Sequence, residues 1–132
     1  MRYVIIGTGV SGFASIEAIR SVDKGGEIIM LGDDPHGYYS RPGLAYYLTG
    51  ELQDKALFPK KREDYAPLNF KFQNARVTKI NRAEKNLLLD GKTILSYDKL
   101  LIATGALAVP LTVPGSNLKG VVKLDHLEDA RQ

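Results

Sequence analysis

The sequence contains no cysteine and no tryptophan among its 132 residues, and only two histidines. Without cysteine, this chain forms no disulfide, offers no thiolate to a metal and carries no cysteine nucleophile. The two histidines, His36 and His126, form no metal-ligating cluster in the sequence. We therefore expect neither metal chemistry nor thiol chemistry from these residues.

Long apolar runs and biased segments are also missing. No apolar run approaches the roughly 18 residues of a membrane span. The apolar start at residues 3–6 turns to glycine too soon for a signal-peptide core. The apolar and charged fractions, 44% and 25%, are those of an ordinary globular protein. We predict one domain over residues 1–132, in the cytoplasm and without membrane contact.

The charge of the chain is too small to indicate a class of binding partner. The net charge is +3, and the basic run Lys60-Lys61-Arg62 is short. This run is typical of a solvated helix start, with a patch that docks an acidic partner as the alternative. No other feature favours nucleic acid as a partner.

The first quarter of the chain predicts a strand, a glycine loop, a helix and a second strand. Residues 3–6 are a short continuous apolar run, as in a central parallel strand buried on both faces. Apolar residues at helical spacing over 13–19 predict a helix that ends before Gly25, and residues 27–31 are again apolar. The crossover between two such strands is right-handed in almost every known case.

The later segments predict a mixed pattern. Short helices are expected over 42–48 and 61–65, a parallel strand over 69–72, short strands over 77–80, 86–89 and 93–95, and a buried strand over 99–103. Asp90-Gly91 is a strong hairpin signal, because glycine accepts a positive φ. The fold class is therefore α/β: a doubly wound, Rossmann-like parallel sheet with an antiparallel β-meander inserted before its last strand.

The glycine loop suggests a dinucleotide site. Gly7 permits the tight turn out of the strand, Gly9 lets the backbone approach a pyrophosphate, and Gly12 lets the helix pack against the sheet. Val10 and Ser11 open the helix, whose free N–H groups and dipole favour phosphate. Because the loop follows a strand, opens a helix and precedes a second strand, its context supports this interpretation over a purely structural turn.

An acidic pair, Asp33-Asp34, follows about 20 residues after the loop, where a carboxylate accepts hydrogen bonds from an adenosine ribose. Asp33 is the better candidate because it is nearer the strand end. The alternative is a solvated turn acid beside Pro35. These features alone do not separate NAD from FAD.

Residues 33–44, Asp-Asp-Pro-His-Gly-Tyr-Tyr-Ser-Arg-Pro-Gly-Leu, resemble a segment of the FAD-dependent pyridine-nucleotide oxidoreductases. That family includes rubredoxin reductases, ferredoxin reductases and the NADH-oxidising part of assimilatory nitrite reductase. The further similar segments are residues 75–80, 90–91, 97–106, 113–115 and 127–130. The resemblance covers nearly the whole chain in the correct order, and the motifs are specific as a set.

The resemblance implies FAD as the cofactor and assigns positions to it. The implied contacts are Gly7, Gly9, Val10, Ser11 and Gly12 at the pyrophosphate, Asp33 at the ribose, Arg41 and Pro42 near the pyrophosphate and flavin, Val77 through its backbone at the adenine, and Thr104 and Gly105 in a turn on the cofactor. A fixed guanidinium suits phosphate geometry, although Arg41 could instead be a solvated residue before a helix proline. Thr104-Gly105 could likewise be a turn that only ends a strand.

Three departures from the family pattern bear on chemistry. Residues 40–42, Ser-Arg-Pro, stand where the disulfide-reductase branch has its redox cysteine pair. Tyr46 stands where many ferredoxin reductases carry a lysine near flavin N5, and Ala108-Val109 replace a usual Pro-Arg. We predict that the tyrosines at 38, 39, 46 and 47 are core residues, with flavin stacking as the alternative. No residue is expected to act as acid, base or nucleophile.

The resemblance implies the FAD-binding segment of an enzyme that passes electrons from NAD(P)H through FAD to an acceptor such as a small redox protein. It also implies a following NAD(P)H-binding domain, which this chain lacks, so the chain alone is expected to be an inactive fragment with a tendency to form a homodimer. The alternatives are a stand-alone NAD-binding module and a regulatory nucleotide-binding domain without turnover.

Overall fold

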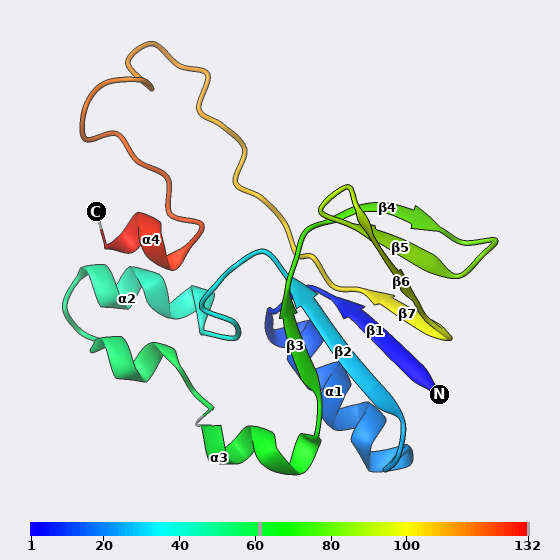
Figure 1. The fold of residues 1–132 in the computed structure, drawn as a ribbon. Helices are drawn as coiled ribbons and strands as arrows, with labels where there is room; N and C mark the ends of the chain where they lie inside the picture. Colours follow the sequence, from blue (N-terminus) through cyan, green and yellow to red (C-terminus); the bar gives the residue numbers. More distant parts are fainter. Residues whose placement is uncertain (61, 132) are drawn as a thin grey trace. The chain divides into compact units, whose positions relative to one another are not determined.

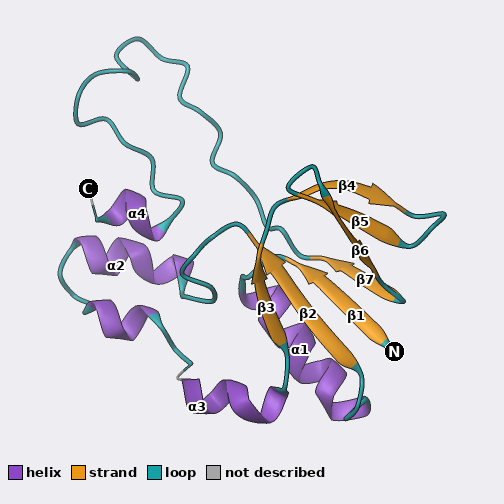
Figure 2. Cartoon of the chain, in the orientation of Figure 1, coloured by secondary structure: helices purple, strands orange, loops and turns teal. Residues whose placement is uncertain are grey.

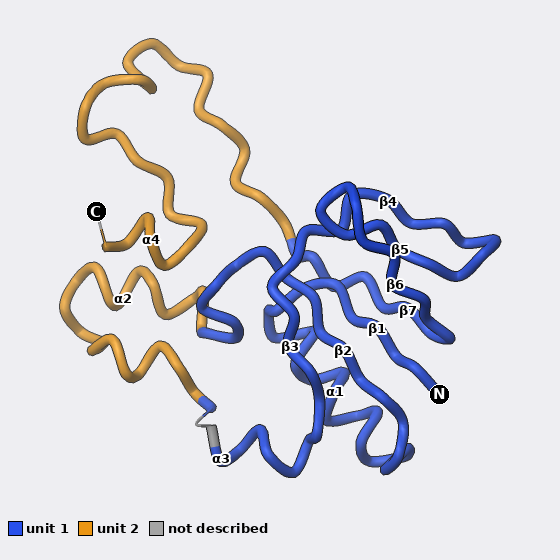
Figure 3. Tube along the Cα trace, viewed as in Figure 1, with its two compact units in different colours: residues 1–39, 60–105 blue, residues 40–59, 106–132 orange. Residues whose placement is uncertain are grey.

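A computed structural model describes residues 1–60 and 62–131, in two compact units (Figure 3). Unit 1 consists of residues 1–39 and 60–105, and unit 2 of residues 40–59 and 106–132. Lys61, which belongs to the basic run and opens the helix predicted over 61–65, lies outside the described residues; the helix is observed over Arg62–Tyr65 (α3). No helix in the described part of the chain is both long enough and apolar enough to cross a membrane.

Unit 1 is built on a parallel sheet in the order β3-β2-β1-β7 (Figure 1). Its strands are β1 (Arg2–Ile6), β2 (Glu27–Gly32), β3 (Lys71–Asn74) and β7 (Lys99–Ile102), and helix α1 (Val10–Val22) connects β1 to β2. In register, Val4 of the central strand lies beside Ile29 and Leu100. This arrangement confirms the predicted α/β class.

Both faces of the central strands are buried, as the apolar runs predict. The parallel sheet lies between α1 on one face and the antiparallel strands on the other (Figure 2). Side chains alternate because successive residues of a strand point to opposite faces. The face toward α1 contains Ile5, Ile28 and Met30 with Phe13 and Ile16, and the other face contains Val4, Ile6, Ile29 and Leu31 with Leu87 and Leu89.

The inserted meander is a three-stranded antiparallel sheet of β4 (Val77–Asn81), β5 (Asn86–Leu89) and β6 (Thr93–Ser96). Its second turn places Asp90 at φ 51° and Gly91 at φ 70°. The Lys92 N–H donates to the Leu89 carbonyl at 3.0 Å. Two successive residues with positive φ match the right-handed twist of the strands, so the predicted hairpin is confirmed.

The connection into β3 differs from its prediction. Residues 69–72 were expected as the strand, but Asn69 has a φ of 42° and ends a 3₁₀ turn (η3, Ala66–Leu68), so β3 begins at Lys71. The buried Arg20 of α1 fixes this junction by donating to the carbonyls of Leu68 and Asn69, both at 2.8 Å. The same guanidinium donates to the Asp23 carbonyl at 2.9 Å.

Unit 2 has less regular structure. Its elements are η1 (Arg41–Gly43), α2 (Leu44–Leu48), η2 (Asp54–Leu57) and α4 (Leu127–Ala130), so the helix predicted over 42–48 begins as a 3₁₀ turn. Its buried side chains include Leu44, Leu57 and Leu127.

The four tyrosines predicted as core residues divide between two environments. Tyr39 is buried, and Tyr38 stacks on Phe13 with ring centroids 4.9 Å apart, which confirms the prediction for these two. Tyr47 is half-buried, whereas Tyr46 is 54% exposed, so the prediction is wrong for Tyr46. Tyr46 lies on the five-residue helix α2, which is too short to bury every apolar side chain it carries.

Candidate functional site

The carboxyl ends of three parallel strands meet at one edge of the sheet in unit 1. Gly7 follows β1, Asp33 follows β2 and Ala103 follows β7. The Gly7 N–H donates to the Leu31 carbonyl at 2.8 Å, and the Ala103 N–H donates to the Ile6 carbonyl at 2.8 Å. In open α/β sheets, ligands bind outside the carboxyl ends of the strands. This edge is therefore the expected place for a ligand.

Two of the three loop glycines are required by the protein itself. Gly7 has a φ of 119°, and a Cβ added there would collide with the carbonyl oxygen of Ala103. A Cβ on Gly12 would collide with the carbonyl oxygen of Gly7. The loop thus turns tightly against β7, and α1 starts against the loop, as the spacing of the glycines predicts.

Gly9 is different, because nothing in the fold requires it. A Cβ on Gly9 would find no atom of the described residues within 4 Å outside its chain neighbours. Gly9 caps α1, and its carbonyl accepts the Phe13 N–H at 3.0 Å. Val10 and Ser11 are exposed beside it. The N–H groups of a first helical turn have no partners inside the helix, so this open space suits an anion.

The two acids after β2 have separate roles. Asp34 is buried and accepts hydrogen bonds from the Tyr39 hydroxyl and the His36 N–H, both at 3.0 Å. Asp33 is exposed, and its carboxylate lies 3.8 Å from the Arg76 guanidinium. Asp34 therefore shapes the turn, while Asp33 is open to a ligand at the ribose position that the sequence predicts for it.

The segment between β3 and the meander is tied to the same edge. The Ala75 N–H donates to the Gly32 carbonyl at 3.0 Å. The Arg76 N–H donates to a carboxylate oxygen of Asp90 at 2.9 Å, and the Asp90 N–H returns to the Arg76 carbonyl at 2.8 Å. Val77, predicted to present its backbone to an adenine, follows directly and is half-buried.

Three residues at this edge of the sheet were not predicted from the sequence as part of the site. For Arg76 and Asp90 the sequence indicated only the start of a strand and a hairpin turn. Their contact depends on how the meander folds back onto the parallel sheet. Gly32 is the third: a Cβ there would lie 2.5 Å from the Cγ2 of the buried Thr8. A glycine directly before the acid, at the end of an apolar strand, was the available signal.

The remaining predicted residues divide between the units. Thr104 and Gly105 follow β7 in unit 1 and are exposed, with Gly105 at a φ of 72°. Arg41 and Pro42 belong to unit 2 and are not brought together with the loop within one unit. Arg41 is half-buried, with one guanidinium nitrogen 3.4 Å from His126 Nδ1 and 3.5 Å from the Asp125 carbonyl. It is therefore not the freely solvated arginine of the alternative interpretation.

The surroundings of Arg41 are acidic and internally paired. The Lys123 ammonium, 2.9 Å away, lowers the pKa of Asp125, whose carboxylate also accepts the Ala108 N–H. Asp129 accepts the N–H groups of Asp125 and His126 at 2.8 and 2.9 Å, which lowers its pKa as well. Within residues 1–60 and 62–131, no group of three or more histidine and acidic side chains could hold a metal ion.

Relatives with names that describe electron-transfer enzymes match nearly the whole chain. The "Probable ferredoxin reductase CtmF" of Castellaniella defragrans is 38% identical over 131 residues, which is 98% of this chain and 32% of that protein. The chain thus spans about a third of the length of such relatives.

Two solved structures extend the likeness to the fold. The ferredoxin reductase for the CYP199A2 system of Rhodopseudomonas palustris superposes with a TM-score of 0.87 at 28% identity, covering 98% of this chain and 32% of that one. A putidaredoxin reductase, solved as a covalent complex with putidaredoxin, gives a TM-score of 0.81 at 28% identity over the same shares.

The family model described as pyridine nucleotide-disulphide oxidoreductase matches residues 1–132, the whole of the chain. The parallel sheet, the glycine loop at its carboxyl edge and the inserted meander are the features by which the structure agrees with that match. The chain belongs to the pyridine nucleotide-disulphide oxidoreductase family.

Proposed function

We propose that this chain is the FAD-binding part of an NAD(P)H-dependent flavoprotein oxidoreductase. The observation that carries the proposal is the open space at Gly9, where the backbone reaches solvent beside the first turn of α1. A group with two adjoining phosphates fits such a place, because unpaired N–H groups and the helix dipole both favour negative charge. The exposed Asp33 on the next strand supplies the acceptor for ribose hydroxyls.

Each end of the cofactor would have its own residues. The loop from Gly7 to Gly12, with Val10 and Ser11, would hold the pyrophosphate, and Asp33 the adenosine ribose. Val77 would offer its backbone to the adenine, while Thr104 and Gly105 would support the cofactor from the end of β7. Arg41 and Pro42, which belong to unit 2, stay predicted contacts of the pyrophosphate and flavin.

The chemistry belongs to the cofactor, and the chain supplies binding and orientation. When bound, FAD would supply the redox chemistry between NAD(P)H and the acceptor, while the loop from Gly7 to Gly12 and Asp33 would hold and orient it. No residue of this chain is needed as acid, base or nucleophile in that scheme. Because the chain has no cysteine, the acceptor takes electrons without help from a thiol of these residues.

We propose a small electron-transfer protein as the acceptor. The support is the wording of the relatives, which are named for ferredoxin and putidaredoxin. The NAD(P)H-binding domain of the whole enzyme is proposed to lie outside these 132 residues, since the chain spans about a third of the relatives it matches. The cytoplasmic location and the homodimer expected from the sequence stay predictions.

A titration of the refolded apoprotein with FAD and with NAD tests the cofactor. FAD is expected to bind more tightly, and a yellow colour after purification, with flavin released by heat, would agree with this. Tighter binding of NAD would contradict the proposal and favour a stand-alone NAD-binding module.

Steady-state NADH consumption with ferricyanide as acceptor tests whether turnover requires the proposed NAD(P)H-binding domain. The 132-residue chain is expected to bind FAD weakly or not at all and to show no sustained turnover, because the site that orients the hydride donor is proposed to lie outside these residues. Such orientation supplies on the order of 7–11 kcal/mol of a comparable barrier. Turnover equal to that of a complete relative would show that the chain is an enzyme by itself.

A further inference from the structure

An exposed arginine stands directly beside the proposed ribose acid. The Arg76 guanidinium nitrogen Nη1 lies 3.8 Å from the Asp33 carboxylate oxygen Oδ2. Three quarters of the Arg76 side chain and two thirds of the Asp33 side chain are exposed (75% and 66%). Both groups can therefore meet a ligand, and neither is hidden by the pair that they form.

Stability does not explain this pair. An ion pair between two solvent-exposed side chains contributes little to folding, because water and salt screen the attraction and both side chains lose freedom. At 3.8 Å the two groups are also beyond hydrogen-bonding distance. The pair is therefore better explained by a ligand that binds beside these two side chains.

The backbone holds Arg76 where it is. Its N–H and carbonyl groups both bind Asp90, at 2.9 and 2.8 Å, and Asp90 is fixed by the hairpin turn with a φ of 51°. One residue earlier, the Ala75 N–H binds the Gly32 carbonyl, directly before Asp33. The two charged side chains therefore start from segments that are fastened to each other.

The two side chains favour opposite ligands. A carboxylate at the end of the second strand accepts from a free ribose 2′-hydroxyl and repels a 2′-phosphate, whereas an arginine near the same place accommodates a 2′-phosphate. A guanidinium suits phosphate because its planar fork matches the phosphate oxygens. This site holds both groups at once.

We propose that Arg76 is a specificity-determining residue, a receptor for an adenosine 2′-phosphate that Asp33 keeps neutralised. The site then selects adenosine with a free 2′-hydroxyl, and loss of the Asp33 charge alone shifts its preference toward adenosine with a 2′-phosphate. The inference rests on the proposed dinucleotide site at this edge of the sheet, and it adds the groups that decide which adenosine that site accepts.

Two probes that differ only in the 2′-phosphate test the inference: adenosine 5′-monophosphate and adenosine 2′,5′-bisphosphate. Their dissociation constants are measured by NMR titration of the 132-residue chain, which reads weak binding directly. The parent is expected to prefer the monophosphate. In Asp33→Asn the relative affinity for the bisphosphate should rise about tenfold, the scale of one partly screened charge-assisted contact.

A double variant shows whether Arg76 is responsible. Asp33→Asn with Arg76→Gln should lose the gain, whereas Asp33→Asn with Arg82→Gln, which removes an equal charge from the far turn of β4, should keep it. A gain that survives Arg76→Gln, or an unchanged ratio in Asp33→Asn, would overturn the inference.

The FAD titration on the same samples separates this result from the proposed function. Binding of FAD by the parent, without the expected change in the ratio, would overturn the role of Arg76 alone. Failure of the parent to bind FAD and both adenosine probes would overturn the site itself and the inference with it.

Discussion

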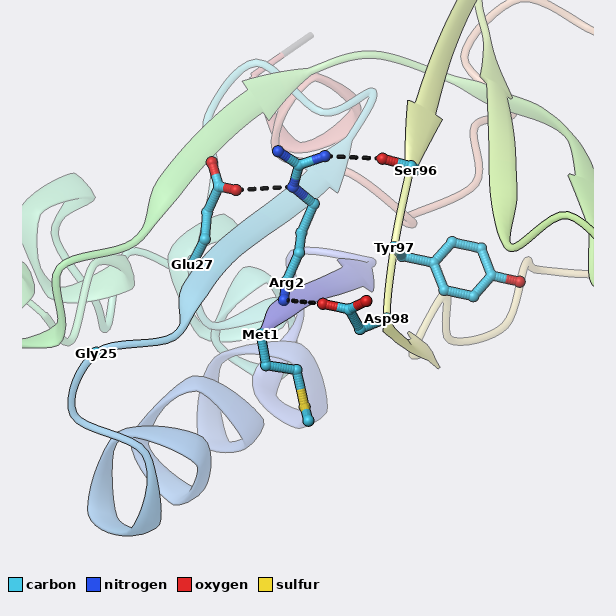
Figure 4. Close-up of a pocket in the computed structure, with 7 residues that line it drawn as sticks. All are labelled: Met1, Arg2, Gly25, Glu27, Ser96, Tyr97 and Asp98. Atoms are coloured by element: carbon cyan, nitrogen blue, oxygen red, sulfur yellow. Dashed lines mark hydrogen bonds and ion pairs between the residues drawn. The ribbon is translucent and has the colours of Figure 1, made fainter.

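The two ends of the parallel sheet in unit 1 differ in how their polar groups are used. At the amino end, the Arg2 guanidinium donates to Glu27 at 2.7 Å and to Ser96 at 2.8 Å, while the Arg2 N–H donates to Asp98 at 2.6 Å (Figure 4). These residues line a polar cavity of about 440 Å³. At the carboxyl end, a Cβ on Gly9 would meet no described atom within 4 Å, and the Asp33 side chain is 66% exposed.

The same contrast extends to the acids. At the amino end, Asp23 accepts the Gly25 and Gly26 N–H groups at 3.0 and 2.7 Å and the Tyr3 hydroxyl at 3.0 Å. At the carboxyl end, the only charged partner of Asp33 among the described residues is Arg76, 3.8 Å away. The amino end uses its polar groups to fasten strands together, whereas the carboxyl end leaves polar groups available to a ligand.

The largest expected effect comes from placing a side chain where the loop touches β7. Gly7→Ala and Gly12→Ala should destabilise the fold by roughly 1–3 kcal/mol or more, because each new Cβ meets a backbone carbonyl that cannot move aside cheaply. Gly7→Ala also strains a positive φ. Chemical denaturation measures the loss. Gly9→Ala, as the control, should unfold like the parent, and equal losses at all three glycines would contradict this account of the loop.

The second effect is on binding without an effect on folding. Gly9→Val should abolish measurable FAD binding, because its side chain fills the space that a pyrophosphate needs, while circular dichroism stays close to the parent. Gly25→Val is the matched control at the amino end, where a Cβ also meets no described atom within 4 Å. Parental FAD affinity in Gly9→Val would place the cofactor elsewhere.

A smaller effect is expected at the ribose acid. Asp33→Ala should raise the dissociation constant of FAD about tenfold or more, as expected for one lost charge-assisted hydrogen bond. Asp98→Asn changes a carboxylate at the amino end and should leave the affinity unchanged. The comparison fails if the two variants weaken FAD binding equally in fluorescence titrations.

The smallest expected effect is on thermal stability, at the amino end of the parallel sheet. A hydrogen bond from Arg2 and a weaker contribution from Lys71 lower the pKa of Glu27 below its usual value of 4.5. A carboxyl with a lowered pKa in the folded state stabilises the protein above that usual value, and the contribution is lost as the pH falls through the folded pKa. Glu27→Gln should therefore lower Tm slightly at neutral pH, and the difference from the parent should shrink in acid.

Thermal melts across this pH range measure the difference. The carboxyl and the amide are both uncharged at low pH, so the melting curves should converge there. A gap between parent and Glu27→Gln that stays constant from neutral to acid pH would contradict the electrostatic origin of the effect.

Much of unit 1 was predictable because its signals are local. A short apolar run followed by three glycines specifies strand, tight turn and helix start, since each depends on neighbouring residues only. Asp90-Gly91 specified its turn for the same reason. The glycine loop was likewise open to prediction from spacing. The role of Asp33 as the ribose acid, which was preferred over Asp34 because Asp33 is nearer the strand end, stays a prediction.

Other features required the chain to meet itself across long sequence distances. Arg20 donates hydrogen bonds to the carbonyls of Leu68 and Asn69, just before β3, which lie 48 and 49 residues further along the chain. The exposure of Tyr46 likewise depends on which surfaces pack together. The sequence by itself determined the glycine loop, the family and the strands other than the start of β3, because these follow from local periodicity and motif order. Only the tertiary structure decided that Asp90 holds Arg76 beside Asp33, because the meander brings residues far apart in sequence to one edge of the sheet.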